Sequence, residues 1–296
     1  MQKKILAIVG PTATGKSSLA VKLAQKFNGE IVSADSRQVY RGLNIGTGKV
    51  TKKEMRNVPH HLLDVANPKK DFNVAQYKKL AEQAVSKILA KGKLPIIVGG
   101  TGFYVESITE GIIIPDVAPN KKLRKKLDKK TTEELASILK KFDPKRYETI
   151  DTKNPRRLIR AIEIATALGK VPPLQKEKPV YKTLKIGLKL PEKILQKKIH
   201  SRLITRIRQG MVAEARRLRV QGLSWKRMEE LGLEYRYLGR YLRGLLNKKE
   251  MVEELERQIR HYAKRQITWF KRNQKIKWFN PKDNRKIDLQ VKNFLD

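Results

Sequence analysis

The chain has 296 residues, which is enough to bury a full hydrophobic core as one domain with an insertion or as two domains. It carries 67 lysines and arginines against 29 aspartates and glutamates, and the resulting net charge of +38 attracts polyanionic partners. The absence of cysteine excludes disulfides, cysteine–zinc sites and thiol nucleophiles and fits a reducing cytoplasm. No apolar run reaches the roughly 18–20 residues that span a bilayer, so no membrane partner is expected.

The first predicted elements frame a glycine-rich loop. Residues 3–9 form a short apolar run rich in β-branched side chains, which predicts a buried strand, and residues 17–26 are apolar at helical spacing. Between them the sequence fits G-x-x-x-x-G-K-[ST], the pattern of a phosphate-binding loop (P-loop) whose lysine contacts the terminal phosphate and whose last hydroxyl ligates Mg²⁺. We therefore predict that a diphosphate or triphosphate is bound by Gly10, Pro11, Thr12, Ala13, Thr14, Gly15, Lys16 and Ser17.

The next two strands argue against an ordinary ATPase. Such enzymes add a strand that ends in an aspartate near the Mg²⁺, and a residue that orients an attacking water. The predicted strand over residues 94–98 is followed instead by Gly-Gly-Thr-Gly, without a carboxylate. The acid at a strand end is Asp35, directly after the predicted strand over residues 30–34. From its position alone, Asp35 could be a Mg²⁺ ligand, a general base or a helix N-cap.

The pattern of elements changes near residue 115. Up to that point strands and helices alternate, as a parallel α/β sheet requires, with an amphipathic helix over residues 74–91. Three helices without an intervening strand are then predicted over residues 120–129, 132–142 and 155–168. A proline-rich linker follows them, then a strand over residues 182–190, long helices, a last strand over residues 276–279 and a tail helix.

These elements predict an α/β fold class: a P-loop-containing nucleoside triphosphate hydrolase-like core with a parallel sheet, plus a small all-helical insertion domain. The core alternates strands with helices, whereas the inserted segment shows only helical periodicity. The predicted core comprises residues 1–115 and 180–296 with basic helices near its C-terminus, and the predicted insertion comprises residues 116–179.

Arginine is distributed less evenly than lysine. Lysines are spread along the whole chain, as in a generally lysine-rich proteome, whereas arginines cluster at residues 156–160, 202–219 and 257–272. The clusters fall on predicted helices, and the last of them includes Tyr262 and Trp269. Arginines that hold phosphates, together with aromatic rings on which bases stack, are typical of nucleic-acid binding. We therefore expect a nucleic-acid partner.

Six sequence blocks follow one another along the chain, over residues 10–17, 35–49, 59–64, 98–104, 154–163 and 262–270. In order and content they resemble the tRNA dimethylallyltransferases, and the resemblance covers nearly the whole chain. It implies transfer of a dimethylallyl group from dimethylallyl diphosphate to the exocyclic N6 of an adenine in the tRNA anticodon loop, normally nucleotide 37. It also implies a P-loop-type core with a helical insertion, and Mg²⁺ as cofactor. We expect a cytoplasmic monomer.

The resemblance implies roles for individual residues. The P-loop and Lys16 hold the diphosphate, Ser17 with Mg²⁺ screens it, and Arg202 reaches it from the opposite side of a channel; the alternative for Arg202 is an ordinary contact to the RNA backbone. Asp35 is implied to be the general base for N6, since the amine is a weak nucleophile. The implied catalytic residues are Asp35, Ser17, Arg202 and Lys16. The implied tRNA contacts are Asp35, Ser36, Arg37, Gln38, Thr101, Arg124, Arg156, Arg157, Arg160, Lys264 and Arg265.

Three other functions compete for the same residues. A small-molecule P-loop kinase and an adenylate prenyltransferase acting on free AMP or ADP would both retain the P-loop and the α/β core, but neither needs the charge of +38 or the arginine-rich late helices. A non-catalytic RNA-binding protein explains the charge and leaves the P-loop and Asp35 without a purpose. On the late helix we expect Trp269 and Phe270 to pack in the core, while Lys264 and Arg265 face RNA.

Overall fold

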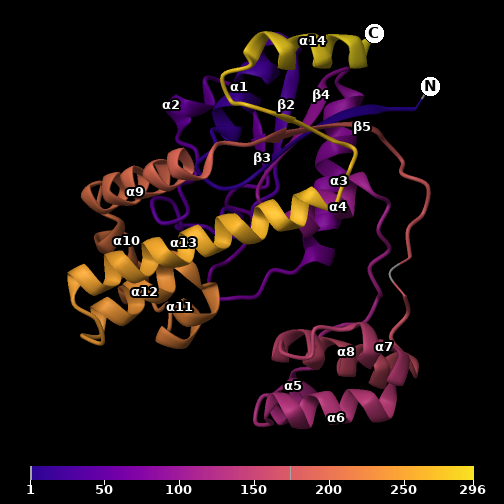
Figure 1. Ribbon diagram of the computed structural model, residues 1–296, viewed down its shortest axis with the longest axis vertical. Coiled ribbons are helices and arrows are strands. Elements are labelled where there is room, and N and C mark those ends of the chain that lie inside the picture. The colour runs from indigo at the N-terminus through magenta and orange to yellow at the C-terminus, as the bar shows by residue number, and fades with distance from the viewer. Residues whose placement is uncertain (1, 174) are drawn as a thin grey trace. The chain divides into compact units, whose positions relative to one another are not determined.

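The computed structural model describes residues 2–173 and 175–296, which divide into two compact units (Figure 1). The larger unit comprises Met1–Gly111 and Lys178–Asp296, and it contains the sheet. The smaller unit is Ile112–Glu177, and its described elements are helices. The insertion expected over residues 116–179 overlaps this smaller unit closely.

The larger unit is built on a parallel sheet of six strands in the order β3-β2-β4-β1-β5-β6. Its central strands are short apolar runs that are buried on both faces, which is the pattern of a parallel sheet covered on each side by helices. The strands are β1 (Lys4–Val9), β2 (Gly29–Ser33), β3 (His60–His61), β4 (Leu94–Val98), β5 (Lys182–Leu188) and β6 (Ile276–Phe279).

Helices cover both faces of this sheet. Successive side chains of a strand point to opposite faces, so Leu6 and Ile8 of β1 pack with α1 and α14, whereas Ile5 and Ala7 pack with α3 and α4. Figure 1 shows α1 and α14 at the top of the view, away from α4. The helices of these two layers are α1 (Lys16–Lys26), α3 (Val74–Ala90), α4 (Gly102–Thr109) and α14 (Asn284–Leu295), and a short helix, α2 (Lys52–Met55), follows the loop after β2.

A separate helical layer has a hydrophobic core of its own. Helices α9 to α12 gather around one half of α13, and the other half of α13 runs toward α4 (Figure 1). Near its end α13 buries Phe270 in the core shared by the sheet, α3 and α4, so this 24-residue helix connects the two cores. The helices are α9 (Glu192–Arg208), α10 (Met211–Val220), α11 (Trp225–Leu231), α12 (Leu233–Leu242) and α13 (Lys248–Lys271). In the described part of the chain, no helix is long and apolar enough to cross a membrane.

The smaller unit packs four helices around a leucine- and isoleucine-rich core. Asp143 ends one helix and caps the next, where its carboxylate accepts the backbone N–H of Arg146. That short helix is absent from the sequence prediction, although an aspartate followed by proline is a start signal. The helices are α5 (Lys121–Leu127), α6 (Thr132–Phe142), α7 (Pro144–Thr149) and α8 (Pro155–Leu168).

Candidate active site

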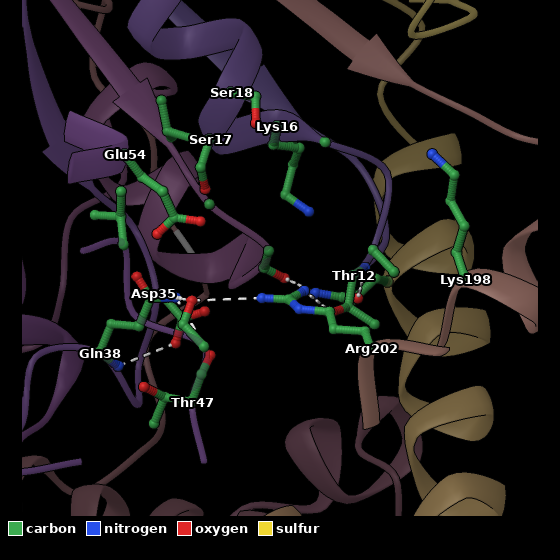
Figure 2. A pocket seen from close by; sticks show the side chains of 18 of the residues that line it. Thr12, Lys16, Ser17, Ser18, Asp35, Gln38, Thr47, Glu54, Lys198 and Arg202 are labelled. Atoms are coloured by element: carbon green, nitrogen blue, oxygen red, sulfur yellow. Dashed lines mark hydrogen bonds between the residues drawn. The ribbon is translucent and has the colours of Figure 1, made fainter. Parts of the chain in front are cut away.

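Three loops meet at one edge of the sheet in the larger unit. Strand β4 lies between β1 and β2, and all three are parallel, so their carboxyl ends lie side by side. The P-loop follows β1, Asp35 follows β2, and the turn Gly99–Thr101 follows β4. With residues from loop 47–54 and from α9 and α13, these loops line a cavity of about 440 Å³ (Figure 2).

The P-loop has the backbone conformation that its glycines permit. Gly10 has φ +134°, and a Cβ at this position would overlap the carbonyl oxygen of Leu188 in β5. Gly15, at φ +88°, precedes α1, whose first turn has no capping side chain and no acidic residue. The first turn of α1 therefore leaves the positive end of the helix dipole for an anion in the cavity.

Lys16 points into the cavity beside this loop (Figure 2). Its ammonium group donates a hydrogen bond to the carbonyl of Pro11 at 2.7 Å. Burial, with the positive charge of Arg202 adding to it, lowers the pKa of Lys16 to about 7, and the carboxylate of Asp35 only partly opposes this effect. An anion in the cavity would favour the charged lysine, so the cavity is suited to a negatively charged ligand.

Arg202 approaches the same cavity from helix α9 (Figure 2). Its guanidinium donates long hydrogen bonds to the hydroxyl of Thr12, at 3.3 Å, and to the carbonyl of Gly48, at 3.4 Å. Burial, followed by the charge of Arg206 one turn away, lowers the pKa of Arg202 to about 10. The structure thus places a guanidinium with weak neutral partners against the P-loop, and its contact with a diphosphate stays a prediction.

Asp35 caps its own turn. One carboxylate oxygen, Oδ1, accepts the backbone N–H groups of Arg37, at 2.8 Å, and Gln38, at 3.2 Å. The turn is also tied to the loop after β4, because the backbone N–H of Ser36 donates to the hydroxyl of Thr101 at 3.0 Å. The residues after Asp35 form a turn and not a helix, so the carboxylate caps a turn and is no helix N-cap. This contact fixes the orientation of a carboxylate that lines the cavity.

Two polar groups of the P-loop are bonded within the protein. The backbone N–H of Thr12 is already bonded to the side-chain oxygen of Gln266, at 2.8 Å, and the hydroxyl of Thr14 donates to the carbonyl of Pro11 inside the loop. These two hydrogen bonds help to shape the P-loop. Sequence reasoning also missed Gln266 itself, because the neighbouring Lys264 and Arg265 gave the stronger signal.

Of the other residues that were predicted to contact RNA, some are exposed without an ion pair in the described part of the chain and others are bonded to a neighbouring side chain. Lys264 and Arg265 are exposed on α13, and Arg156 is exposed on α8. Arg157 is also exposed and forms an ion pair with Asp151 at 3.3 Å. Trp269, expected in the core, is only partly buried and donates its indole N–H to Glu106, whereas Phe270 is buried as expected.

Arg124 and Arg160 have bonding partners within the smaller unit. Both guanidinium groups bond to the buried carboxylate of Glu163 in the smaller unit, and Arg160 also donates to the carbonyl of Val117. The backbone N–H of Asn120 also donates to Glu163, so three residues bond to this buried acid and fix the packing of α5 against α8. Both arginines therefore have a structural contact, and their role in tRNA binding stays a prediction.

The fold and the cavity define a P-loop protein of the α/β class with a cation-lined cavity at the carboxyl edge of its sheet. The family model "IPP transferase" matches residues 38–273. The tRNA dimethylallyltransferase of Anoxybacillus flavithermus is 39% identical over 300 residues, covering 100% of this chain and 96% of that protein. The enzyme of the same name from Pediococcus pentosaceus is 40% identical over 303 residues, covering 99% of this chain and 97% of that protein.

Solved structures show the same relationship. The tRNA isopentenylpyrophosphate transferase of Bacillus halodurans superposes with a TM-score of 0.74 at 35% identity, covering 100% of this chain and 96% of that one. A eukaryotic dimethylallyltransferase, studied while acting on tRNA, superposes with a TM-score of 0.78 at 25% identity and covers 98% of this chain and 77% of that one. The chain belongs to the IPP transferase family, the tRNA dimethylallyltransferases.

Proposed function

We propose that this chain transfers a dimethylallyl group from dimethylallyl diphosphate to N6 of adenosine 37 in the anticodon loop of tRNA, and that the reaction occurs in the cavity of Figure 2. One observation carries the proposal for the site. Two partly buried cations, Lys16 and Arg202, line the same cavity as the carboxylate of Asp35. A group-transfer reaction with an anionic leaving group and a protonated nucleophile needs that combination.

The cations act on the leaving group. In the transfer step the bond between C1 of the dimethylallyl group and the bridging oxygen breaks, and the diphosphate takes both electrons of that bond. Charge therefore accumulates on the diphosphate as it departs. Lys16 and the P-loop hold it from one side and Arg202 from the other, where a low local dielectric strengthens the attraction.

Asp35 acts on the nucleophile. The N6 lone pair of adenine is delocalised into the ring, so the amine attacks C1 readily only if its proton is removed as the new N6–C1 bond forms. The carboxylate of Asp35 accepts that proton. Because its Oδ1 is held by the two backbone N–H groups of its own turn, the carboxylate is oriented before the adenine arrives.

Magnesium fits this cavity as an ion shared with the substrate. The Ser17 hydroxyl and the Glu54 carboxylate, both oxygen donors of the kind Mg²⁺ prefers, line the cavity. Within the described residues there is no cluster of three or more histidines, cysteines, aspartates or glutamates that would form an all-protein metal site. When bound, the ion would neutralise part of the diphosphate charge.

The acceptor is proposed to be held by polar groups around Asp35 and by basic residues farther out. Ser36, Arg37, Gln38 and Thr101 surround the turn of Asp35, and their hydrogen-bonding groups suit an extruded base. Exposed basic residues then bind phosphates of the tRNA backbone: Lys264 and Arg265 in the larger unit, and Arg156 and Arg157 in the smaller one. We infer that the enzyme acts as a monomer in the cytoplasm.

The choice of acceptor tests this function. The protein is incubated with labelled dimethylallyl diphosphate and Mg²⁺ and, in separate reactions, with unmodified tRNA, AMP or ATP. We expect label on tRNA and none on either nucleotide. Label on AMP would favour an adenylate prenyltransferase, and loss of a phosphate from ATP to a small acceptor would favour a kinase.

A further inference from the structure

The side chain of Gln266 joins two loops that are far apart in sequence. Its Oε1 accepts the backbone N–H of Thr12 in the P-loop at 2.8 Å, and its Nε2 donates to the carbonyl of Gly100, in the turn after β4, at 2.9 Å. Gln266 lies on α13, and only 5% of it is exposed to solvent. A buried amide with both of its ends bonded to backbone groups holds those groups at a fixed separation.

Each of the two loops continues to one side of the proposed reaction. Thr12 accepts a hydrogen bond from Arg202, on the side of the diphosphate. Next to Gly100, the hydroxyl of Thr101 accepts the backbone N–H of Ser36, which neighbours Asp35 on the side of the acceptor base. One amide therefore lies between the site of the leaving group and the loop that carries the proton acceptor.

The surroundings of Gln266 leave little room for another arrangement. A Cβ placed on Gly100 would overlap the amide nitrogen of Gln266, so the turn can come this close only with glycine at that position. Tyr262, one helical turn earlier on α13, lines the same cavity, and its hydroxyl interacts with the side chain of Thr101. Helix α13 thus contacts two consecutive residues of the turn after β4, Gly100 and Thr101, and one residue of the P-loop, Thr12.

We propose that Gln266 is a positioning residue, which sets the separation between the P-loop and the loop of Asp35 and so aligns the dimethylallyl carbon with the adenine amine. This inference rests on the proposed function. Attack at a carbon with a departing diphosphate requires the nucleophile and the leaving group to be in line, and a displacement of about 1 Å can slow such a step by about 10²-fold. Gln266 also lines the cavity, but in this role it acts through the two loops that it joins.

The sharpest test is Gln266→Glu, which keeps an oxygen for the N–H of Thr12 and removes the donor to Gly100. Gln258→Glu, the same change at a partly exposed position of α13, is the matched control for the added charge. With Gln266→Glu we expect kcat/KM for dimethylallyl diphosphate to fall at least about tenfold, while the Kd for tRNA changes less than about twofold relative to Gln258→Glu.

The dependence on pH adds a readout that a merely structural role would not move. When the new carboxyl group is protonated it can donate to the carbonyl of Gly100, so the activity ratio of Gln266→Glu to wild type should rise as the pH is lowered from 8 to 6. A second variant, Gln266→Met, fills the same space without hydrogen bonds, and its deficit should be independent of pH.

The results of these experiments distinguish a failure of the positioning role from a failure of the proposed function on which it rests. A wild-type protein that transfers no label to tRNA contradicts the function. An active wild-type protein with Gln266→Met or Gln266→Glu equally active contradicts the positioning role. Equal losses in tRNA binding and in turnover, at every pH, also contradict it, since they indicate a general loss of folded structure. If Gln266→Glu does not fold, the split between turnover and tRNA binding in Gln266→Met decides the question.

Discussion

Asp35 shows how a single side chain can hold more than one role. Its Oδ1 caps the turn after β2, while the carboxylate lines the cavity that contains Lys16. A cap needs only a hydrogen-bond acceptor, which asparagine also supplies, whereas a general base needs a group that takes up a proton. Replacement of the carboxylate by the amide therefore separates the two roles.

Asp35→Asn should slow the chemical step roughly 10²–10⁴-fold, while the free energy of unfolding changes by only a few tenths of a kcal/mol. Single-turnover rates with saturating tRNA and dimethylallyl diphosphate, measured across a Mg²⁺ titration, report the chemical step. Asp288→Asn, on the surface of α14, is the control. A wild-type rate for Asp35→Asn would rule out the base, and recovery at high Mg²⁺ would indicate a metal ligand instead.

Lys16 links diphosphate binding to pH. Its pKa of about 7 lies below the ordinary lysine value, so in the free protein it loses its proton as the pH rises through 7. A bound diphosphate stabilises the charged form, so binding above pH 7 should take up a proton and weaken as the pH rises. Calorimetry of inorganic diphosphate binding at pH 8, in buffers of different ionisation enthalpy, measures this uptake.

Lys16→Arg is the control for the calorimetry of diphosphate binding. Lys16→Arg keeps the positive charge but stays protonated over the same range, so the part of the proton uptake that belongs to Lys16 should disappear. Identical uptake by the wild-type protein and Lys16→Arg would show that the protons go to the diphosphate and not to Lys16.

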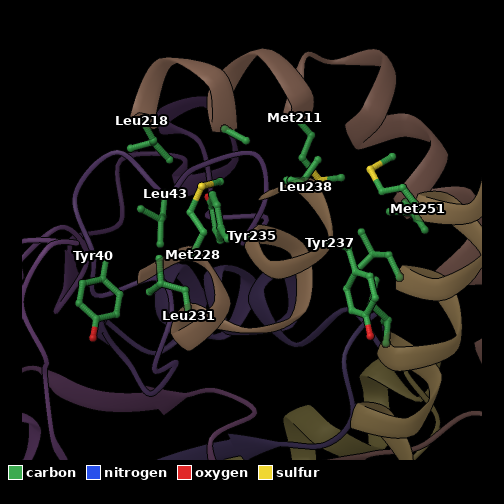
Figure 3. Packing of buried hydrophobic residues seen from close by; sticks show 14 of the residues in the cluster. Tyr40, Leu43, Met211, Leu218, Met228, Leu231, Tyr235, Tyr237, Leu238 and Met251 are labelled. Atoms are coloured by element: carbon green, nitrogen blue, oxygen red, sulfur yellow. The ribbon is translucent and has the colours of Figure 1, made fainter. Parts of the chain in front are cut away.

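At the level of elements, the loop before α2 depends on a residue from α10. The buried carboxylate of Glu214 accepts the backbone N–H groups of Asn44, Ile45 and Gly46, and the hydroxyl of Tyr235. Figure 3 shows Tyr235 within the hydrophobic cluster that surrounds this contact. The cluster thus places the loop whose later residues contribute to the cavity.

Glu214→Ala should lower the free energy of unfolding by about 3 kcal/mol, because it leaves several buried N–H groups without an acceptor. Urea unfolding of the variant and of wild type measures the difference. Glu253→Ala, at an exposed position of α13, should stay within about 0.5 kcal/mol of wild type. A loss of less than about 1 kcal/mol at Glu214 would mean that the loop is held by its other contacts.

The elements whose bounds were predicted correctly are those that a short stretch of sequence identifies by itself. The strand over residues 94–98 and the strand over residues 276–279 have the predicted bounds, because each is an apolar run between turn residues. The fold class, the family and the activity predicted from the six blocks are confirmed by the comparisons. The edge strand β3, only two residues long, has no periodicity from which it could be predicted.

Contacts between distant residues account for what the sequence did not predict. Gln266 bonds to Thr12, 254 positions away, and nothing in its local sequence distinguishes it from a surface glutamine. Arg124 and Arg160 occupy helical positions that suit a solvated basic face equally well, and only the burial of Glu163 reveals their pairing. The roles of the individual site residues remain predictions.

The charge of the whole molecule governs its encounter with RNA. With a net charge of +38, binding of tRNA should rest on many phosphate contacts and release many counterions. If about 6–10 phosphates are contacted, the affinity for tRNA should fall about 10³–10⁵-fold between 50 and 200 mM salt. Fluorescence anisotropy with labelled tRNA across that range measures the slope. A nearly flat dependence would contradict the electrostatic explanation, provided that circular dichroism shows an unchanged fold.

The most direct test of the whole account is to locate the transferred group in the RNA. The wild-type protein is incubated with dimethylallyl diphosphate, Mg²⁺ and an unmodified tRNA, and the product is digested with nuclease and analysed by mass spectrometry. We expect one dimethylallyl group on N6 of adenosine 37, and no product when that nucleotide is guanosine. A group at another nucleotide, on a phosphate or on the guanosine-37 tRNA would contradict it.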